Sequence, residues 1–301
     1  MQALYAYFKQ DNADIAFYEK ELFKSLDKIY DLYITILALY ADIHHTAHLV
    51  IEENKNKLLP GPDDLDPNLK FIQNSLLKGI SESTELKKEI HNRKISWQND
   101  LDLVRKLFSE IRQSELYKTY MATPGSSVKE EKEFLITLTG EYLAEHELLN
   151  HLFEERNIHW TDDMYVAFTM VMRTFEAYTG EFKLLPLYKD PEDDKKFAAT
   201  IFRQTILHND EFEKLIDAKT KNWELERIAA MDVLLMKMAL TEFLNVSNVP
   251  VKVSLNEYID ISKEYSTPNS RTFINGVLDK IIVDLRNENR IQKTGRGLLE
   301  S

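Results

Sequence analysis

The sequence lacks cysteine entirely in its 301 residues, which excludes disulfide scaffolds, thiolate metal sites and cysteine nucleophiles. It also lacks any unbroken run of about 18 apolar residues, the length that a membrane-spanning helix requires. Its first residues become polar too early to form the apolar core of a signal peptide. From these absences we expect a soluble cytoplasmic protein with no segment in a membrane.

Glycine and proline are scarce, at eight residues each, and they gather in a few short segments. Between those segments, apolar residues recur at spacings of three and four, the period of an amphipathic helix. Alternating patterns typical of strands are rare, so the sequence predicts an all-α protein. The expected helices lie near 14–56, 98–120, 127–158, 162–179, 191–220, 224–246, 254–265 and 270–288, with shorter ones between 66 and 93.

Local signals mark the start of several of these helices. Asp190 followed by Pro191 has the form of an N-cap with proline at the first helical position. Ser254 and Glu257 have the spacing of a capping box, in which each side chain bonds to the other residue's backbone amide. The segment Pro268–Ser270 should end one helix and cap the next.

Motifs that cradle phosphates or carry nucleophiles are missing from the sequence: there is no Walker loop, GxGxxG, GxSxG or EF-hand loop. His44, His45 and His48 fall on one expected helix. His44 and His48 have the i, i+4 spacing that can hold a metal ion, with Glu52 one turn further. No HExxH motif and no second histidine pair accompany them. We expect no enzyme, no metal and no cofactor, and keep a metal-dependent hydrolase at these histidines as an alternative.

Charge is unevenly distributed along the chain. The formal net charge is −12. Such a charge disfavours non-specific binding of nucleic acid, because that binding depends on basic side chains that neutralise phosphates. Residues 252–301 nevertheless carry eight basic and seven acidic side chains. The acidity therefore belongs to the rest of the sequence.

The C-terminal end combines aromatic rings with cations. Tyr265 and Phe273 flank the Pro268–Ser270 segment, and three basic residues lie near it: Lys263, Arg271 and Lys280. Unpaired bases stack on aromatic rings while cations meet the phosphates, so this arrangement favours a surface that binds single-stranded nucleic acid. The alternative is that both rings are core residues at the ends of helices.

Part of the sequence resembles another part at a shift of 63 residues. Identical pairs are Lys132 and Lys195, Phe134 and Phe197, Thr137 and Thr200, Leu152 and Leu215, and Trp160 and Trp223. Apolar pairs are Leu138 and Ile201, Leu149 and Phe212, and Phe153 and Ile216. The matches have helical phase, which indicates stacked helical hairpins. A duplication and a coincidence between amphipathic helices both remain open.

Four sequence blocks stand in order along the chain. They are MQALYAYF at 1–8, the segment from Asn222-Trp223 to MKMALTEFL at 222–244, VPVKVSLNEYIDISK at 249–263 and SRTFINGVLDK at 270–280. Together they resemble the NusB family of bacterial transcription antitermination factors, in the long form found in Bacteroidetes-type bacteria. The resemblance covers residues 1–10 and about 191–285.

This resemblance implies a NusB-like helical bundle with a large helical insertion. The expected N-terminal helical region is 1–222, made of the first-helix motif at 1–10, the insertion at about 12–190 and a central hairpin helix at about 191–222. A C-terminal NusB-like helical subdomain is expected at 223–287, and a flexible tail at 288–301.

The function that the resemblance implies is non-enzymatic. Such a factor binds boxA-like single-stranded RNA together with a NusE-like small-subunit ribosomal protein, in the RNA polymerase antitermination complex at ribosomal RNA operons. The positions that match the family's RNA surface are Tyr5, Tyr265, Asn269, Ser270 and Phe273. Asp232 matches an acid in the region that meets NusE. The family has phenylalanine in place of Tyr265 and commonly an acid near Asn269.

One departure from the family concerns charge. Family members carry an arginine-rich segment before the first-helix motif, whereas this sequence begins at Met1 inside that motif. Either the start is truncated or misassigned, or RNA binding depends on the partner protein, because fewer phosphate contacts mean weaker binding at physiological salt. The alternative function is an acidic helical scaffold that binds proteins and no RNA. The sequence leaves the oligomeric state open, a homo-oligomer included.

Overall fold

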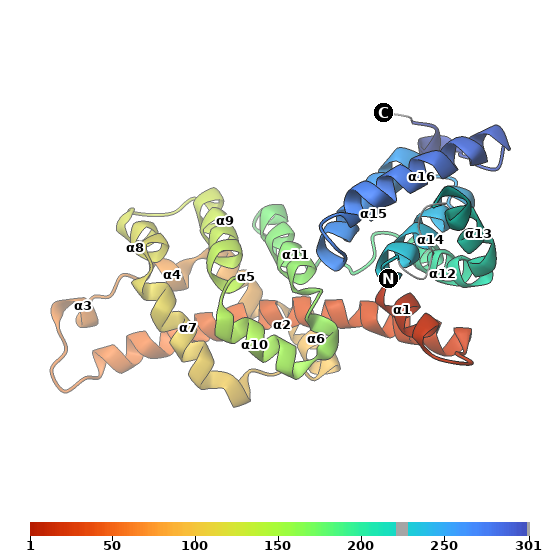
Figure 1. The fold of residues 1–301 in the computed structure, drawn as a ribbon. Helices are drawn as coiled ribbons and strands as arrows, with labels where there is room; N and C mark the ends of the chain where they lie inside the picture. The colour runs from red at the N-terminus through yellow and green to blue at the C-terminus, as the bar shows by residue number, and fades with distance from the viewer. Residues whose placement is uncertain (221–227, 300–301) are drawn as a thin grey trace. The chain divides into compact units, whose positions relative to one another are not determined.

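A computed structural model describes residues 1–220 and 228–299, and every regular element in these ranges is a helix (Figure 1). The all-α prediction is thus confirmed. The chain forms two compact units: unit 1 comprises residues 1–23 and 188–301, and unit 2 comprises residues 24–187. The boundary that we expected at 222/223 does not divide these units, because the helices before it and after it share one core.

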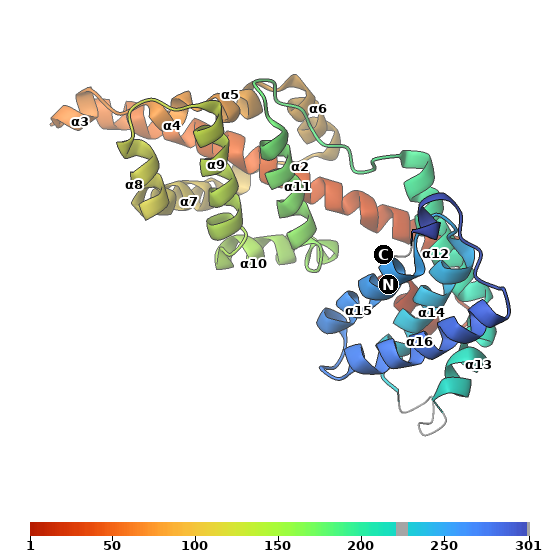
Figure 2. The ribbon, with the colours of Figure 1, turned by 90° about the horizontal axis from the view of Figure 1, so that it is seen from above.

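Unit 1 is built around one buried helix, α14 (Ala230–Asn245). Contacts join α14 to four other helices, which surround it in Figure 2: α12 (Pro191–Leu207), α13 (Asn209–Lys219), α15 (Val251–Tyr265) and α16 (Ser270–Asn287). The N-terminal helix α1 (Gln2–Lys9) packs on α12 and α14. Segments from both ends of the chain therefore complete the same core.

Helix α12 begins as the sequence predicts. The Asp190 side chain accepts hydrogen bonds from the backbone amides of Glu192 (3.1 Å) and Asp193 (3.2 Å), with Pro191 at the first helical position. This cap satisfies amides that have no partner within the helix. The single helix expected at 191–220 is in fact two, because the chain turns at His208 between α12 and α13.

The capping box predicted at Ser254 is wrong. Helix α15 begins three residues earlier, at Val251, and places Ser254 inside the helix, where it is buried. Its hydroxyl donates to Oε1 of Glu242 on α14 (2.6 Å), and the Tyr258 hydroxyl donates to Oε2 (2.9 Å). A buried carboxylate needs such donors. Burial, together with Glu242, raises the pKa of Tyr258 well above its usual value.

The segment after α16 is folded onto unit 1, where we expected a flexible tail. The Lys293 ammonium donates to the backbone carbonyls of Glu242 (3.1 Å) and Val246 (2.6 Å), and the Thr294 amide donates to that of Ser247 (2.8 Å). These carbonyls belong to the C-terminal end of α14, where a helix leaves acceptors without internal partners. Burial lowers the pKa of Lys293 to about 8.

Unit 2 consists of short helices packed on the long helix α2 (Ile15–Lys55), which starts in unit 1. In chain order they are α3 (Pro62–Leu65), α4 (Lys70–Gln73), α5 (Ser75–Glu82), α6 (Thr84–Arg93), α7 (Leu101–Gln113), α8 (Glu115–Ala122), α9 (Val128–Thr137), α10 (Glu147–Arg156) and α11 (Met164–Ala177). The helices expected at 98–120 and 127–158 are each divided. Ser114 caps α8 and ends the first, and a π-helical turn at Leu138–Leu143 interrupts the second.

Helix α2 is, among the described helices, the one that is long and apolar enough to cross a membrane by length and composition alone. We expected no such segment. However, 61% of its most apolar stretch is buried, and its tyrosines bond inside unit 2. The Tyr33 hydroxyl lies 2.8 Å from Thr174 Oγ1, and the Tyr40 hydroxyl lies 2.6 Å from Thr139 Oγ1. These contacts fit the core helix of a folded unit.

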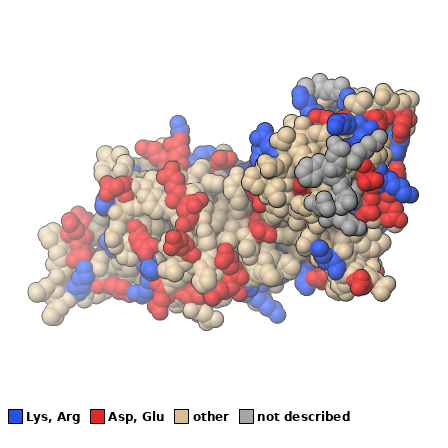
Figure 3. All heavy atoms as spheres, in the orientation of Figure 1, with Lys and Arg blue, Asp and Glu red and all other residues tan. Residues whose placement is uncertain are grey.

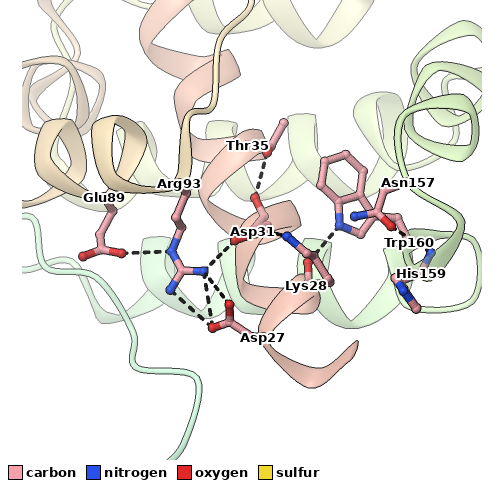
Figure 4. Close-up of polar contacts among 9 residues, drawn as sticks. All are labelled: Asp27, Lys28, Asp31, Thr35, Glu89, Arg93, Asn157, His159 and Trp160. Carbon is pink, nitrogen blue, oxygen red and sulfur yellow. Dashed lines mark hydrogen bonds and ion pairs between the residues drawn. The ribbon is translucent and has the colours of Figure 1, made fainter. Parts of the chain in front are cut away.

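A polar cluster ties α2 to α6 (Figure 4). The Arg93 guanidinium donates to Asp31 (2.5 Å), to Glu89 (2.9 Å) and to Asp27 (3.4 Å). In the same region, the Trp160 indole donates to the backbone carbonyl of Lys28 (2.8 Å). Glu89 lies on α6 with Arg93, so the contacts that join the two helices are those to Asp27 and Asp31 on α2.

The two units share an internal pattern at the shift of 63 residues. Ser127 caps α9 and Asp190 caps α12. Three matched pairs are buried in both units: Leu138 with Ile201, Leu149 with Phe212, and Phe153 with Ile216. Helix α2 contacts the α9 and α11 segments, as α1 contacts α12 and α14. The match fails at Phe134, which is 4% exposed against 41% for Phe197, and Trp223 lies outside the described residues.

Candidate nucleic-acid interface

Four of the residues that the sequence singled out lie in or beside the loop between α15 and α16: Tyr265, Asn269, Ser270 and Phe273. Tyr265 is the last residue of α15, Asn269 is the N-cap of α16, and Phe273 lies one turn into α16. Asn269 is exposed, whereas Tyr265 and Phe273 are half-buried, and Phe273 packs against the core of unit 1. Both rings are therefore partly exposed to solvent.

Asp232 connects this loop to the first turn of α14. It is 5% exposed, and Oδ2 accepts a hydrogen bond from Ser270 Oγ (2.7 Å) while Oδ1 accepts one from Ser266 Oγ. Ser270 Oγ also accepts from the Thr267 amide (3.2 Å) and lies 2.8 Å from Thr267 Oγ1. One carboxylate and three hydroxyls thus form a closed polar cluster beneath the loop.

This cluster changes the interpretation of two predicted site residues. We expected Ser270 to contact RNA and Asp232 to contact a partner protein. Ser270 is 1% exposed, and the polar atoms of both side chains are directed at each other. A direct contact with a ligand needs surface that neither residue offers. Sequence reasoning also missed Ser266 and Thr267, although a run of hydroxyl residues around a proline is a usable signal for such a turn.

Charged side chains of both signs lie on the two helices that adjoin the loop, among them the exposed acids Glu264 and Asp279. Arg271 and Lys280 on α16 are exposed, and Lys263 on α15 pairs with Asp260 at 2.5 Å. Asn269 makes no side-chain capping bond to α16. The N-terminal end of a helix carries a partial positive charge, which favours an anion. The groups here that favour a phosphate are thus Arg271 and the N-terminal end of α16.

Tyr5 lies in a groove on another side of α14. The groove has a volume of about 560 Å³ and is lined from α1 by Tyr5, Phe8 and Lys9, from α13 by Asn209 and Glu213, and from α14 and the residues before it by Ile228, Ala230, Val233, Leu234 and Lys237. Tyr5 is 39% exposed, and the Lys9 ammonium lies 5.5 Å from the centre of its ring. Aromatic, apolar and cationic side chains therefore line one groove.

Lys237 is a buried cation within that groove. Its ammonium donates to Asn209 Oδ1 (2.6 Å) and Glu213 Oε1 (2.6 Å), and it lies 5.1 Å from the centre of the Phe8 ring. Neither Phe8 nor Lys237 was singled out from the sequence. The sequence signal for Lys237 was a lysine within the apolar run of α14. A cation buried there requires partners, and these partners mark the groove.

The groove and the loop meet at the same turn of α14. Ala230 and Val233 line the groove, whereas Asp232 between them holds the loop. Tyr5 and the Tyr265–Phe273 segment therefore approach one helix end from two sides. The sequence blocks that carry these residues are more than 250 positions apart, and the fold brings them to the same end of unit 1.

The histidines of α2 do not form a metal site. His44 is buried, with Nδ1 2.8 Å from Ser81 Oγ and Nε2 2.9 Å from the backbone carbonyl of Ile72. Both ring nitrogens are thus engaged, and burial lowers the pKa of His44. Within residues 1–220 and 228–299, no group of three histidine, aspartate or glutamate side chains is placed to hold a metal ion. The hydrolase alternative therefore has no support from this cluster.

Most of the negative charge belongs to unit 2. Its sequence carries 27 acidic and 19 basic residues, against 23 and 19 in unit 1. Figure 3 shows acidic side chains spread over the face of unit 2 that is in view. Unit 1, which holds the candidate interface, is therefore the less acidic of the two.

Comparison with known proteins identifies the family. A model of the NusB family matches residues 169–283, which include α12 to α15 and most of α16. The transcription antitermination protein NusB of Salinibacter ruber is 48% identical over 115 residues, which make up 38% of this chain and 71% of that protein. The chain belongs to the NusB family.

Other NusB proteins are similar over the same share of the chain. The protein of Desulfatibacillum aliphaticivorans is 40% identical over 106 residues, covering 35% of this chain and 74% of its own length. That of Chloroherpeton thalassium is 39% identical over 106 residues, covering 35% of this chain and 50% of its own length. No solved structure matches the chain. The chain is a transcription antitermination protein of a non-enzymatic family, and almost all of unit 2 lies outside the family match.

Proposed function

We propose that this NusB-family protein binds boxA-like single-stranded RNA together with a NusE-like ribosomal protein, within the RNA polymerase antitermination complex of the cytoplasm. The observation that carries the proposal is the α15–α16 loop. It presents two half-exposed aromatic rings and an exposed amide beside cations, at the end of the unit that matches the family.

The chemistry of this loop suits unpaired bases. Tyr265 and Phe273 offer ring faces on which bases stack, and the Asn269 amide can donate to and accept from a base edge. Arg271 and Lys280 would meet the phosphates, assisted by the positive end of α16. Each stacked base contributes about 1–3 kcal/mol to such complexes.

The groove on α1, α13 and α14 supports the part of the proposal that concerns a protein partner. It is apolar on its floor, at Val233 and Leu234, and carries Tyr5 and Phe8 on its wall. Aromatic residues around a desolvated centre are typical of protein–protein contacts. Tyr5, which the family resemblance assigns to RNA, lines this groove. The acidic chain favours a basic partner.

A binding titration tests the proposal. A fluorescein-labelled boxA-like RNA is titrated with the protein alone, with the NusE-like protein alone and with both, and a scrambled RNA of equal length is the control. We expect tight, sequence-dependent binding with both proteins and weak binding with either alone, because the net charge of −12 disfavours binding of RNA by this chain by itself. Equal affinity for the two RNAs in every arm would refute the proposal.

A second candidate function is a protein-binding scaffold without RNA binding. It is favoured by the acidic excess of unit 2 and by a second groove there, of about 580 Å³, whose lining includes Val50, Phe71, Phe108, Asp63 and Asp66. Protein partners that stay bound after ribonuclease treatment, together with no RNA binding in the titration above, would support it. A homo-oligomer also stays a prediction, which light scattering after size exclusion would test.

A further inference from the structure

Asp232 is an unusual residue for the inside of a helical bundle. Its carboxylate is buried, and the partners that satisfy it are the hydroxyls of Ser266 and Ser270. Burying an ionised carboxylate is unfavourable unless strong hydrogen bonds replace its water. Asp232 is the acid of the first turn of α14, where the positive end of the helix offsets part of this cost. Both of its hydroxyl partners come from the α15–α16 segment.

The hydroxyls that Asp232 holds are placed next to the candidate RNA-contacting residues. Ser266 directly follows Tyr265, and Ser270 directly follows Asn269 and lies one helical turn before Phe273. Ser270 also restrains the backbone of the loop, because its Oγ accepts a hydrogen bond from the Thr267 amide at 3.2 Å. Hydrogen bonds between hydroxyls and a carboxylate are stronger than those between neutral groups. One side chain on α14 thus fixes both ends of the loop.

We propose that Asp232 is the positioning residue of the RNA-binding loop: its buried carboxylate fixes Ser266 and Ser270, and so sets the spacing of the Tyr265 and Phe273 rings and the orientation of Asn269. This inference rests on the proposed function, in which that loop meets RNA. Asp232 itself touches no base. Its effect is to remove the conformational freedom that the loop would otherwise lose on binding RNA.

Charge and positioning make opposite predictions for Asp232→Ala. The substitution removes one negative charge near the RNA, which should tighten binding if electrostatics alone matters. Positioning predicts the reverse, because the two rings no longer share a fixed spacing. Asp260→Ala is the matched control: it also removes one acid near the loop, but Asp260 is exposed and pairs with Lys263 instead of holding the serines.

The experiment measures three quantities on the full chain. The first is the affinity for the fluorescein-labelled boxA-like RNA in the presence of the NusE-like protein. The second is the fluorescence of 2-aminopurine in the same RNA, which falls when that base stacks. The third is amide hydrogen exchange in residues 266–272, with α12 and α13 as internal references. Asp232→Asn, which retains an acceptor oxygen, and Ser270→Ala are further variants if Asp232→Ala folds poorly.

We expect Asp232→Ala and Ser270→Ala to weaken RNA binding at least about fivefold, the lower limit for one lost stacked base. Asp232→Asn should weaken it less, and Asp260→Ala should not weaken it. The 2-aminopurine signal should lose part of its quenching, and exchange should accelerate in residues 266–272 but not in α12. Combining Asp232→Ala with Phe273→Ala should weaken binding by less than the product of the two single effects, since both act on one ring.

Two results would overturn the inference while leaving the proposed function standing, and a third would refute both. Unchanged exchange in residues 266–272 would show that Asp232 does not hold the loop. Accelerated exchange with unchanged or tighter RNA binding would show that the fixed loop is irrelevant to RNA. Absence of RNA binding by the wild type would refute the proposed function and the RNA role of Asp232 together, while the exchange data would still report whether the carboxylate fixes the loop.

Discussion

Replacing Phe273 by leucine should weaken RNA binding while leaving unit 1 nearly as stable as before. The ring packs on the core of unit 1 and stays partly exposed. Leucine keeps an apolar side chain on the core, and hydrophobic exchanges of this kind usually destabilise by less than about 1.5 kcal/mol. What leucine removes is the flat π face on which a base would stack.

The expected loss in binding follows from the stacking contribution. A stacked base contributes about 1–3 kcal/mol, so Kd should rise about 5- to 150-fold. Phe273→Ala should lose the same affinity and also destabilise the fold, by a part of the roughly 3–5 kcal/mol that a fully buried phenylalanine contributes. Anisotropy titration with boxA-like RNA measures the first effect, and urea unfolding measures the second.

A tyrosine at the same position provides the control. Phe273→Tyr keeps the ring and should bind RNA with an affinity close to that of the wild type. The reasoning would be refuted if Phe273→Leu bound RNA as tightly as the wild type, because the open ring face would then have no part in recognition. Equal weakening by Phe273→Tyr and Phe273→Leu would likewise point to packing instead of stacking.

Three further predictions concern stability. His44 has a lowered pKa in the folded state, so the histidine of the unfolded chain is protonated at a higher pH than that of the folded chain. Unit 2 should therefore lose stability as the pH falls below about 6.5. Urea unfolding at pH 7.5 and 5.5 should show this loss in the wild type and less of it in His44→Gln. A Cβ on Gly297 would lie 2.1 Å from the carbonyl oxygen of Ser247, so Gly297→Ala should loosen the C-terminal segment, seen as faster hydrogen exchange in residues 290–298 with Gly276→Ala, whose Cβ would meet nothing within 4 Å, as the comparison. Ser254→Ala leaves a buried carboxylate oxygen of Glu242 without its donor and should destabilise unit 1 by about 1–3 kcal/mol; a thermal midpoint equal to that of the wild type would contradict the buried contact.

The candidate site was partly accessible from the sequence. Tyr265 and Phe273 were singled out because rings and cations lie near a turn, and Asn269 was singled out by the family resemblance. The structure places Tyr265 at the end of α15 and the other two at the start of α16. The role of Asp232 was not accessible in this way. Its partners lie 34 and 38 positions away, and no local pattern relates an acid in one helix to serines beyond the next helix.

The capping box at Ser254 illustrates the same limit. A serine three residues before a glutamate predicts a helix start whenever the serine faces water. Here the neighbouring helix α14 presents the Glu242 carboxylate, and bonding to it holds Ser254 inside α15. The contact between Ser254 and Glu242 therefore decided the start of the helix against the local capping pattern. A buried carboxylate without donors would be the less stable arrangement.

The sequence by itself determined the helical class, the cap at Asp190 and the resemblance to the NusB family, because periodicity, capping and ordered motifs are properties of residues near one another in the chain. Only the tertiary structure decided that the chain forms two units, that Ser270 and Asp232 are buried against each other, and that the C-terminal segment covers the end of α14. Burial and long-range hydrogen bonds depend on which helices meet, and that information is spread over the whole chain.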